Sequence, residues 1–329
     1  MGEQPFIQFE NITKSFGRNV VLEDVNLSIP YKEIFGIIGK SGSGKTTLLT
    51  LLIGFLKPDI GTVIFQSRDI QRDLQSVQQQ FGFAAQEGSF YPKLTVKENL
   101  WYFGRMYNIK PKQLKEKIPK LLKLVNLQDA NDVVAWKLSS GMQKRLDIAC
   151  ALIHDPKVLI LDEPTEDLDP ALRNEILNLL RKINREKDLT IIITSHLLNE
   201  MESFCKKVAI LDRKKIIDSG NINDLKNKYS KYLELCLEFE DPDDDYIISE
   251  IKTNRKIKKY SVRGNKIYIY TNQKGEEALN NVVSLAREAG NRLVNVTMGK
   301  QNLTELFEEL TKYGEKEDVK VIRDNKEKH

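Results

Sequence analysis

The sequence predicts an α/β fold with a mixed sheet, followed by a small α+β domain. Three stretches predict the sheet. A glycine-rich loop at 39–46 lies between an apolar strand candidate and a stretch of helical character. An apolar run at 158–161 ends in two acidic residues, and a β-branched run follows at 190–194. Short apolar runs of this kind are typical of parallel strands that are buried on both faces.

The composition is that of an ordinary soluble protein. The chain has 329 residues, enough for two domains, with 40% hydrophobic and 30% charged residues. Its 51 basic and 47 acidic residues are interspersed, so the net charge of +4 gives no argument for binding nucleic acid or an anionic membrane. Three widely spaced cysteines favour a reducing cytosol. The N-terminus lacks a signal-peptide layout, and no apolar run approaches the ~18 residues that span a bilayer, so we expect no direct membrane insertion.

The glycine-rich loop, called the phosphate loop below, matches the pattern Gly-x4-Gly-Lys-[Ser/Thr]. An apolar strand at 34–38 precedes it, and helical residues 47–53 follow it and end at Gly54. Backbone N–H groups and the helix N-terminus make such a loop a nest for phosphate oxygens. We expect Lys45 to reach the β and γ phosphates and Thr46 to offer its hydroxyl to Mg²⁺. The predicted nucleotide-binding residues here are Gly39, Lys40, Ser41, Gly42, Ser43, Gly44, Lys45, Thr46 and Thr47.

An antiparallel layer is predicted near the N-terminus. Residues 6–12 and 21–29 alternate apolar and polar side chains, as half-buried strands do, and 61–65 reads as another short strand. Phe16 lies between the first two strands, where core filling and a functional role are equally open on these observations.

A further strand and a helical insert follow. Residues 81–86 read as a strand whose last residue is the amide Gln86. A capping box that begins at Thr95 marks the start of one helix, and leucines predict another at about 111–125. We therefore expect a mostly helical insert at about 92–136.

Two acidic residues end the apolar run at 158–161. A central parallel strand would deliver Asp162 and Glu163 to the carboxyl edge of the sheet, where the phosphate loop also lies. Asp162 can then hold Mg²⁺ through water, and Glu163 can polarise the attacking water. The run at 190–194 delivers His196 to the same edge as a candidate γ-phosphate contact. The plainer alternative is a strand that ends in Asp-Glu before a proline turn.

The chain resembles the nucleotide-binding subunit of an ATP-binding cassette (ABC) transporter over approximately residues 5–225. Six motifs carry this resemblance in the order of that family: the phosphate loop, Gln86, residues 138–145, the Asp162-Glu163 pair, residues 166–169 and His196. The resemblance implies a P-loop NTPase fold of the ABC type, with a RecA-like mixed sheet core, an antiparallel β subdomain and a helical subdomain. It implies ATP and Mg²⁺ as cofactors and ATP hydrolysis as the activity. The catalytic residues that it implies are Lys45, Gln86, Glu163 and His196, and the metal residues are Thr46, Gln86 and Asp162.

The resemblance also assigns nucleotide contacts outside the phosphate loop. In this family an aromatic residue ahead of the loop stacks on adenine, a signature motif starts a helix, and a dimer-contact loop follows the catalytic glutamate. Residues 138–145 match the signature motif and 166–169 match the dimer-contact loop. The contacts assigned in this way are Phe16, Ser139, Gly141 and Asp169.

Four residues depart from the family pattern or mark a branch of it. Ser140 replaces the first of two glycines in the signature motif, which could hinder close approach to phosphate. Met142 resembles the branch that exports drugs and antibiotics. Glu166 and Asp167 replace small residues in the dimer-contact loop, and we expect their carboxylates to repel the phosphates of a partner site.

An accessory α+β domain is predicted at 226–312, after a nucleotide-binding domain at 1–225, and residues 313–329 read as a disordered polar tail. The accessory domain contains an acidic turn at 241–245 that could suggest a metal site. Because the turn lacks the spacing of a Ca²⁺ loop, we expect it to be solvated. The expected elements are a basic link at 225–231, a strand at 233–239, the acidic turn at 241–245, a helix near 246–252, a hairpin turning at Gly264-Asn265, a helix at about 276–289 ended by Gly290, a strand at 293–298, and a helix from Asn302 that Glu305 caps.

One copy of each motif implies a head-to-tail dimer, of identical or paralogous subunits, that acts on a separately encoded membrane permease. The resemblance then places the protein in the cytoplasm, peripheral on the inner face of the cell membrane, with no nucleic-acid partner. The main alternative is a soluble ABC ATPase that acts on ribosomes or DNA. A GTPase is disfavoured because no Asn-Lys-x-Asp element is present, and an inactive interaction module because the catalytic set is complete.

Overall fold

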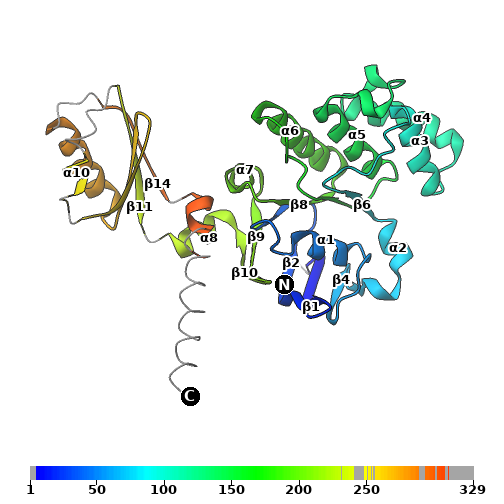
Figure 1. Ribbon diagram of the computed structural model, residues 1–329, viewed down its shortest axis with the longest axis horizontal. Coiled ribbons are helices and arrows are strands. Elements are labelled where there is room, and N and C mark those ends of the chain that lie inside the picture. The colour runs from blue at the N-terminus through cyan, green and yellow to red at the C-terminus, as the bar shows by residue number, and fades with distance from the viewer. Residues whose placement is uncertain are drawn as a thin grey trace, which may run out of the picture. The chain divides into compact units, whose positions relative to one another are not determined.

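The computed structural model describes residues 5–230, 232–240, 248–249, 251–252, 254, 256–288, 293–300, 302–307 and 310. The chain divides into two compact units, Met1–Ile222 and Asn223–His329, which are described separately (Figure 1).

The first unit contains a four-stranded antiparallel sheet in the order β2-β1-β4-β5. Its strands are β1 (Ile7–Phe16), β2 (Asn19–Ile29), β4 (Ile60–Phe65) and β5 (Arg68–Asp69). The predicted antiparallel layer is therefore confirmed. Strand β1 runs four residues beyond its expected end and carries Phe16 as its last residue, directly before a turn at Gly17 with φ 61°.

The second sheet of this unit has six strands in the order β10-β9-β3-β8-β7-β6. They are β3 (Ile34–Ile38), β6 (Phe81–Ala84), β7 (Val158–Leu161), β8 (Thr190–Ser195), β9 (Lys207–Asp212) and β10 (Lys215–Asn221). All neighbours are parallel except β10, which is antiparallel to β9, so the predicted mixed sheet is confirmed. The carboxyl ends of β3, β7 and β8 meet at one edge.

The helices of the first unit are α1 (Lys45–Leu52), α2 (Leu74–Gln78), α3 (Val96–Met106), α4 (Pro111–Leu124), α5 (Ser140–Leu152), α6 (Pro170–Lys187) and α7 (Leu198–Phe204). The capping box predicted at Thr95 is present, because the Glu98 N–H donates to Thr95 Oγ1 at 3.2 Å and the Thr95 N–H donates to Glu98 Oε2 at 2.8 Å. One boundary was wrong. Strand β6 ends at Ala84, since its ladder with β7 stops where β7 itself ends, and Gln86 lies in the turn that follows.

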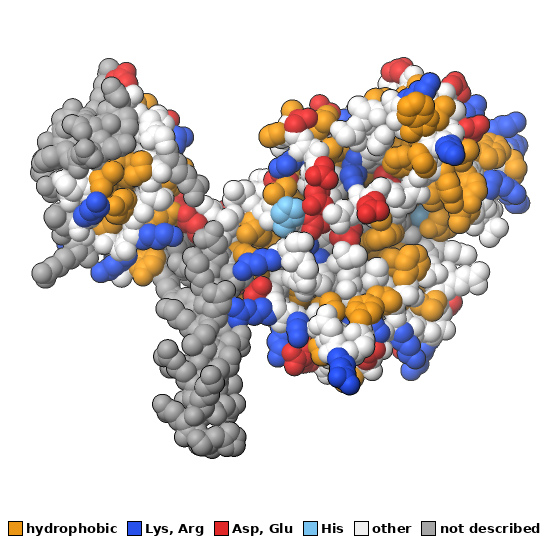
Figure 2. Space-filling view, viewed as in Figure 1, with side chains coloured by type: hydrophobic (Ala, Val, Ile, Leu, Met, Phe, Trp, Pro, Cys, Tyr) orange, Lys and Arg blue, Asp and Glu red, His pale blue; other side chains and the backbone are white. Residues whose placement is uncertain are grey.

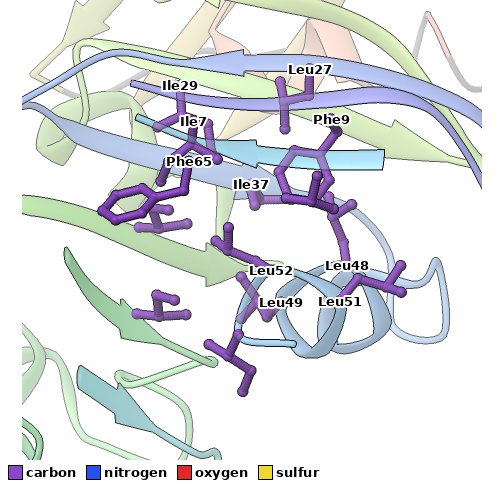
Figure 3. Close-up of a cluster of buried hydrophobic side chains, with 14 of the residues drawn as sticks. Ile7, Phe9, Leu27, Ile29, Ile37, Leu48, Leu49, Leu51, Leu52 and Phe65 are labelled. Carbon is purple, nitrogen blue, oxygen red and sulfur yellow. The ribbon is translucent and has the colours of Figure 1, made fainter. Parts of the chain in front are cut away.

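Helix α1 packs between the two sheets. Its four leucines, at 48, 49, 51 and 52, are buried beside apolar side chains of both sheets (Figure 3). The labelled partners are Ile7, Phe9, Leu27, Ile29, Ile37 and Phe65. Each fully buried leucine contributes about 1.5–3 kcal/mol of transfer free energy, so this core fixes the helix that follows the phosphate loop.

The second unit contains a four-stranded antiparallel sheet in the order β12-β13-β11-β14. Its elements are β11 (Leu233–Phe239), β12 (Ile257–Arg263), β13 (Lys266–Thr271), β14 (Leu293–Lys300), α10 (Gly275–Glu288) and a helical turn at 303–307. The hairpin at Gly264-Asn265 is confirmed. The Glu305 N–H donates to Asn302 Oδ1 at 2.9 Å, as the predicted cap requires.

The basic link predicted at 225–231 was wrong. Helix α8 (Ile222–Tyr229) occupies most of it, because Ile222 and Leu225 have buried side chains at helical spacing ahead of the lysines at 226 and 228. The acidic turn at 241–245, Gly290 and the tail at 313–329 lie outside the described residues. Of the expected helix near 246–252, residues 248–249 and 251–252 are described, and they are helical.

An acidic pair in the second unit links β11 to the helical turn at 303–307. Burial and the neighbouring carboxyl of Glu305 raise the pKa of Glu234 to about 7, while Lys226 opposes the shift. The Tyr270 hydroxyl donates to Glu305, and burial raises the pKa of that hydroxyl. Glu234 therefore retains its proton at a pH where an ordinary glutamate is ionised.

This pair predicts that the second unit loses stability as the pH rises from about 5 to about 7. In that interval the folded unit binds more protons than the unfolded chain, so the free energy of unfolding falls with pH. Glu234→Gln should remove most of this slope. We would measure amide hydrogen exchange in β11 and β13 at pH 5 and 8, corrected for intrinsic rates. Glu238→Gln, which alters a carboxylate 3.6 Å from Lys266 Nζ, is the control. A slope that survives in Glu234→Gln would contradict the assignment.

Candidate functional site

The phosphate loop joins β3 to α1 and wraps around the side chain of Lys45. The Lys45 ammonium is buried and donates to the carbonyl oxygens of Gly39, at 2.9 Å, and Lys40, at 3.1 Å. A Cβ at Gly39 would lie 2.4 Å from the backbone oxygen of Leu211, so only glycine fits there. Within the described part of the chain, the buried Ser43 Oγ has no hydrogen-bond partner. A hydroxyl without a partner inside a cradle of N–H groups suits a phosphate oxygen.

Asp162 lies at the carboxyl end of β7, where two threonine hydroxyls hold it. Thr46 Oγ1 donates to Asp162 Oδ2 at 2.7 Å, and Thr194 Oγ1 donates to Asp162 Oδ1 at 2.6 Å. The carboxylate is 2% exposed. Carboxylate and hydroxyl oxygens are the hard ligands that Mg²⁺ prefers, so Thr46 and Asp162 fit the metal site that the sequence predicts.

Thr194 is a site residue that the sequence analysis missed. Besides holding Asp162, its hydroxyl accepts a hydrogen bond from the Glu163 N–H at 2.9 Å, so one side chain on β8 positions both acids. The available signal was a polar residue that directly follows three isoleucines, two positions before the predicted His196.

Glu163 lies between a lysine and a histidine. Its Oε1 is 3.0 Å from Lys45 Nζ, and its Oε2 is 2.5 Å from His196 Nδ1. Glu163 has φ 46°, a left-handed conformation that is uncommon for glutamate and is often found at functional sites. The structure thus brings together three of the four predicted catalytic residues.

Gln86, the fourth, makes a different contact. Its Nε2 donates to Glu166 of the dimer-contact loop, and its backbone carbonyl accepts from Lys144 Nζ at 3.1 Å. Ligand atoms of Glu163, Glu166 and His196 lie within 4.8 Å of one another. Glu166 is therefore a neighbour of the catalytic pair in its own chain, a contact that the sequence did not predict.

The signature motif and the dimer-contact loop each begin a helix. Ser139 is the N-cap of α5 and accepts from the Met142 N–H at 3.4 Å, while Asp169 caps α6 through the N–H groups of Ala171 and Leu172, both at 3.0 Å. Gly141 packs on Leu172, and a Cβ there would lie 3.0 Å from its Cδ2. Among the described residues, neither Ser139 nor Gly141 hydrogen-bonds to the phosphate loop.

Phe16 is 49% exposed at the end of β1, with Lys14 Nζ 5.6 Å from its ring centroid. This exposure removes the core-filling alternative and leaves the predicted stacking on adenine as a proposal. We expect Phe16→Ala to weaken ATP binding by ~1–3 kcal/mol, the range for base stacking on aromatic side chains, with modest preference for ATP over GTP in the parent. Equilibrium titration with a fluorescent ATP analogue measures this, with Phe55→Ala as the matched exposed control. An unchanged affinity would exclude stacking.

No helix in the described residues is long and apolar enough to cross a membrane.

Comparison with known proteins agrees with the resemblance. A family model described as ABC transporter matches residues 22–166. The linearmycin resistance ATP-binding protein of Bacillus subtilis is 34% identical over 219 residues, 67% of this chain and 70% of that protein. The bacitracin transport ATP-binding protein of Bacillus licheniformis is 30% identical over 307 residues, 92% of this chain and 96% of that protein. A methionine import ATP-binding protein of Bacillus cereus is 38% identical over 227 residues, 67% of each chain.

Solved structures confirm the fold class. The chain is similar to cbiO1 of Clostridium perfringens, part of the ABC transporter complex cbiONQ, at TM-score 0.63 and 26% identity, covering 69% of this chain and 95% of that one. It is also similar to a dimeric post-hydrolysis state of an ATP-binding cassette bound to ADP and Pi, at TM-score 0.59 and 27% identity, covering 65% and 98%. From these matches and the site described above, the chain belongs to the ATP-binding subunits of ABC transporters and is an ATP hydrolase of that family.

Proposed function

We propose that this ATP-binding subunit powers an exporter, as one half of an ATP-sandwich dimer docked on a separate membrane permease. The observation that supports export over import is how much of the chain is similar to each relative. The match to the bacitracin transport protein covers 92% of the chain and therefore includes second-unit residues, whereas the match to the methionine importer covers 67%. The relative associated with linearmycin resistance supports the same direction, since removal of a drug from the cell confers resistance.

The hydrolytic roles follow from the site geometry. The Lys45 ammonium would bind the β and γ phosphates, and the Glu163 carboxylate would accept a proton from the attacking water. His196 orients that carboxylate through the contact at 2.5 Å and would contact the γ-phosphate. Mg²⁺, held by Thr46 and Gln86 and through water by Asp162, would neutralise charge that develops on the phosphates. Thr194 keeps Asp162 and Glu163 in register for these roles.

The second half of each ATP site would come from a partner copy. Ser139 and Gly141 of one subunit, with Asp169, would face the phosphates bound by the other subunit. Because each chain carries one phosphate loop and one signature motif, two chains would then form two complete ATP sites. The dimeric cassette structure bound to ADP and Pi supports this arrangement. A second copy of this chain or a paralogue would serve equally.

A substitution at Ser140 would test whether this side chain limits how tightly the dimer closes. Ser140 is exposed at the first turn of α5 and shares a small cavity with Glu166 and Asp167. We expect Ser140→Gly to remove a clash with phosphate and to strengthen ATP-dependent dimerisation about fivefold, the equivalent of ~1 kcal/mol, with a parallel rise in turnover. Dimerisation is measured by sedimentation in a Glu163→Gln background, where hydrolysis does not perturb the equilibrium. Weaker dimerisation than the parent would make the Ser140 hydroxyl a ligand instead.

A groove in the first unit suits a helix of the permease. The groove is a cavity of about 320 Å³ beside α2 and α3. Its lining includes Phe55, 68% exposed, and Met106, 61% exposed. Figure 2 shows hydrophobic side chains gathered on this unit. Apolar surface of this kind marks a protein contact, and a permease helix there would place the protein on the inner face of the membrane.

The test combines the protein with a candidate permease, chosen as a membrane protein encoded near its gene. Co-expression should yield a detergent-stable complex that hydrolyses ATP, and Met106→Asp should reduce complex formation without changing the ATPase activity of the free subunit. Deleting the gene should increase cellular accumulation of an antibiotic. Slower uptake of methionine in the deletion strain would show that the protein powers import instead. Co-sedimentation of the protein with ribosomes and not with membranes would favour the soluble ATPase alternative.

A further inference from the structure

Two side chains of the signature helix α5 hold the loop that carries Gln86. This loop, residues 85–89, is called the glutamine loop below. The Ser89 N–H donates to Asp147 Oδ1 at 2.7 Å, and Lys144 Nζ donates to the backbone carbonyl of Gln86 at 3.1 Å. Lys144 and Asp147 are three positions apart on α5, so they share a face of the helix. The loop is thus held at both ends.

The burial of Asp147 makes this arrangement costly to maintain. Asp147 is 1% exposed, and its Oδ2 has no hydrogen-bond partner among the described residues. Burial raises the pKa of Asp147 to about 6, while Lys144 and the Ser89 N–H oppose the shift. Burial also lowers the pKa of Lys144, against the attraction of Asp147 and Glu166. Burying a carboxyl group of which only one oxygen accepts a hydrogen bond is unfavourable in free energy. The contact is therefore best explained by a need to hold the glutamine loop in place.

Packing of the fold does not require the Asp147 contact. Strand β6 already touches α5 directly, because a Cβ at Gly82 would lie 2.1 Å from the backbone oxygen of Ala151. This close backbone approach fixes the strand against the helix. Among the described residues, the hydrogen bonds of Asp147 and Lys144 are made beyond the strand end, to the glutamine loop.

We propose that Asp147 and Lys144 are positioning residues that fix the glutamine loop to the signature helix, so that Gln86 and Ser139 move as one body. The proposal rests on the proposed role of Gln86 at the metal. While the loop backbone is held, the Gln86 amide reaches its partners by side-chain rotation alone. A domain movement that shifts the signature helix toward a partner's nucleotide therefore shifts Gln86 by the same amount.

The experiment compares two substitutions at Asp147 in the full chain. Asp147→Leu removes the acceptor for the Ser89 N–H, whereas Asp147→Asn keeps an acceptor oxygen and removes only the charge. We expect Asp147→Leu to lower kcat about tenfold and to raise the Mg²⁺ concentration for half-maximal activity, as loss of outer support to a metal site does, with ATP affinity within about twofold of the parent. Asp147→Asn should retain most of the parent kcat. Asp129→Leu, on an exposed turn, is the control for substitution of an aspartate.

A readout independent of turnover is amide hydrogen exchange of residues 85–89. The Ser89 N–H should be protected in the parent and in Asp147→Asn and should exchange at least about tenfold faster in Asp147→Leu. Unchanged exchange together with unchanged kcat in Asp147→Leu would overturn the proposal. If Asp147→Leu does not fold, Lys144→Met replaces it, and the parent kcat together with the parent Mg²⁺ dependence in that variant would count against the proposal.

Gln86→Ala separates failure of this proposal from failure of the role assigned to Gln86. If Gln86→Ala leaves kcat and the Mg²⁺ dependence unchanged, the role of Gln86 fails. If Gln86→Ala impairs both and Asp147→Leu impairs neither, only the positioning proposal fails. In the double variant the two losses should not add, because both act through the same amide.

Discussion

Glu163→Gln is expected to lower ATP turnover by about 100- to 10,000-fold while ATP binding is retained. The amide is nearly isosteric with the carboxylate and keeps an acceptor oxygen, but it does not take a proton from water. With hydrolysis blocked, the ATP-bound dimer should accumulate. Single-turnover hydrolysis and the molecular mass in ATP and Mg²⁺ measure the two effects.

The control for this prediction is Glu186→Gln on α6, where a glutamate lies 4.0 Å from Lys182 on the helix surface. It should hydrolyse ATP like the parent. Near-normal turnover in Glu163→Gln would remove Glu163 from the role of base and direct attention to Glu166, whose carboxylate lies in the same group of ligand atoms.

Lys45→Met is expected to weaken ATP binding by ~1.5–3 kcal/mol, roughly 10- to 150-fold, and to abolish measurable turnover. The methionine retains much of the aliphatic stem but offers no charge to the phosphates. The Lys45 ammonium also contacts Glu163 and two loop carbonyls, so the variant should lose stability as well. Isothermal titration with ATP and thermal unfolding measure the two consequences.

Lys182→Met, which removes a half-exposed lysine of α6, controls for the change of residue type. It should leave ATP affinity unchanged. Binding by Lys45→Met at the parent affinity would show that backbone N–H groups of the phosphate loop are sufficient to hold the nucleotide.

Much of the site was predictable because its signals are contiguous in the sequence. The phosphate loop, the Asp162-Glu163 pair and His196 each follow an apolar strand, and parallel strands deliver their carboxyl ends to one edge. Contacts between distant segments were not predictable in this way. Gln86 meets Glu166 across 80 positions, and Ser89 meets Asp147 across 58. No local propensity encodes such pairs.

The errors in the fold have local causes. Strand β6 is shorter than its apolar pattern suggests because pairing with β7 limits it. Helix α8 was missed because most of residues 222–229 are polar, while the two buried positions that define its apolar face, Ile222 and Leu225, are only three apart. A pattern of two residues is too short to distinguish a helix from a linker.

The placement of α1 between the two sheets has a consequence for how the first unit melts. One set of leucines contributes to the packing of both sheets, so the antiparallel layer and the mixed sheet should unfold in a single transition. Because α1 begins at Lys45, a nucleotide that binds only the folded loop should raise the melting temperature of both layers equally. A destabilising change as distant as Phe9 in β1 should correspondingly lower the apparent affinity for ATP once the unit is marginally stable.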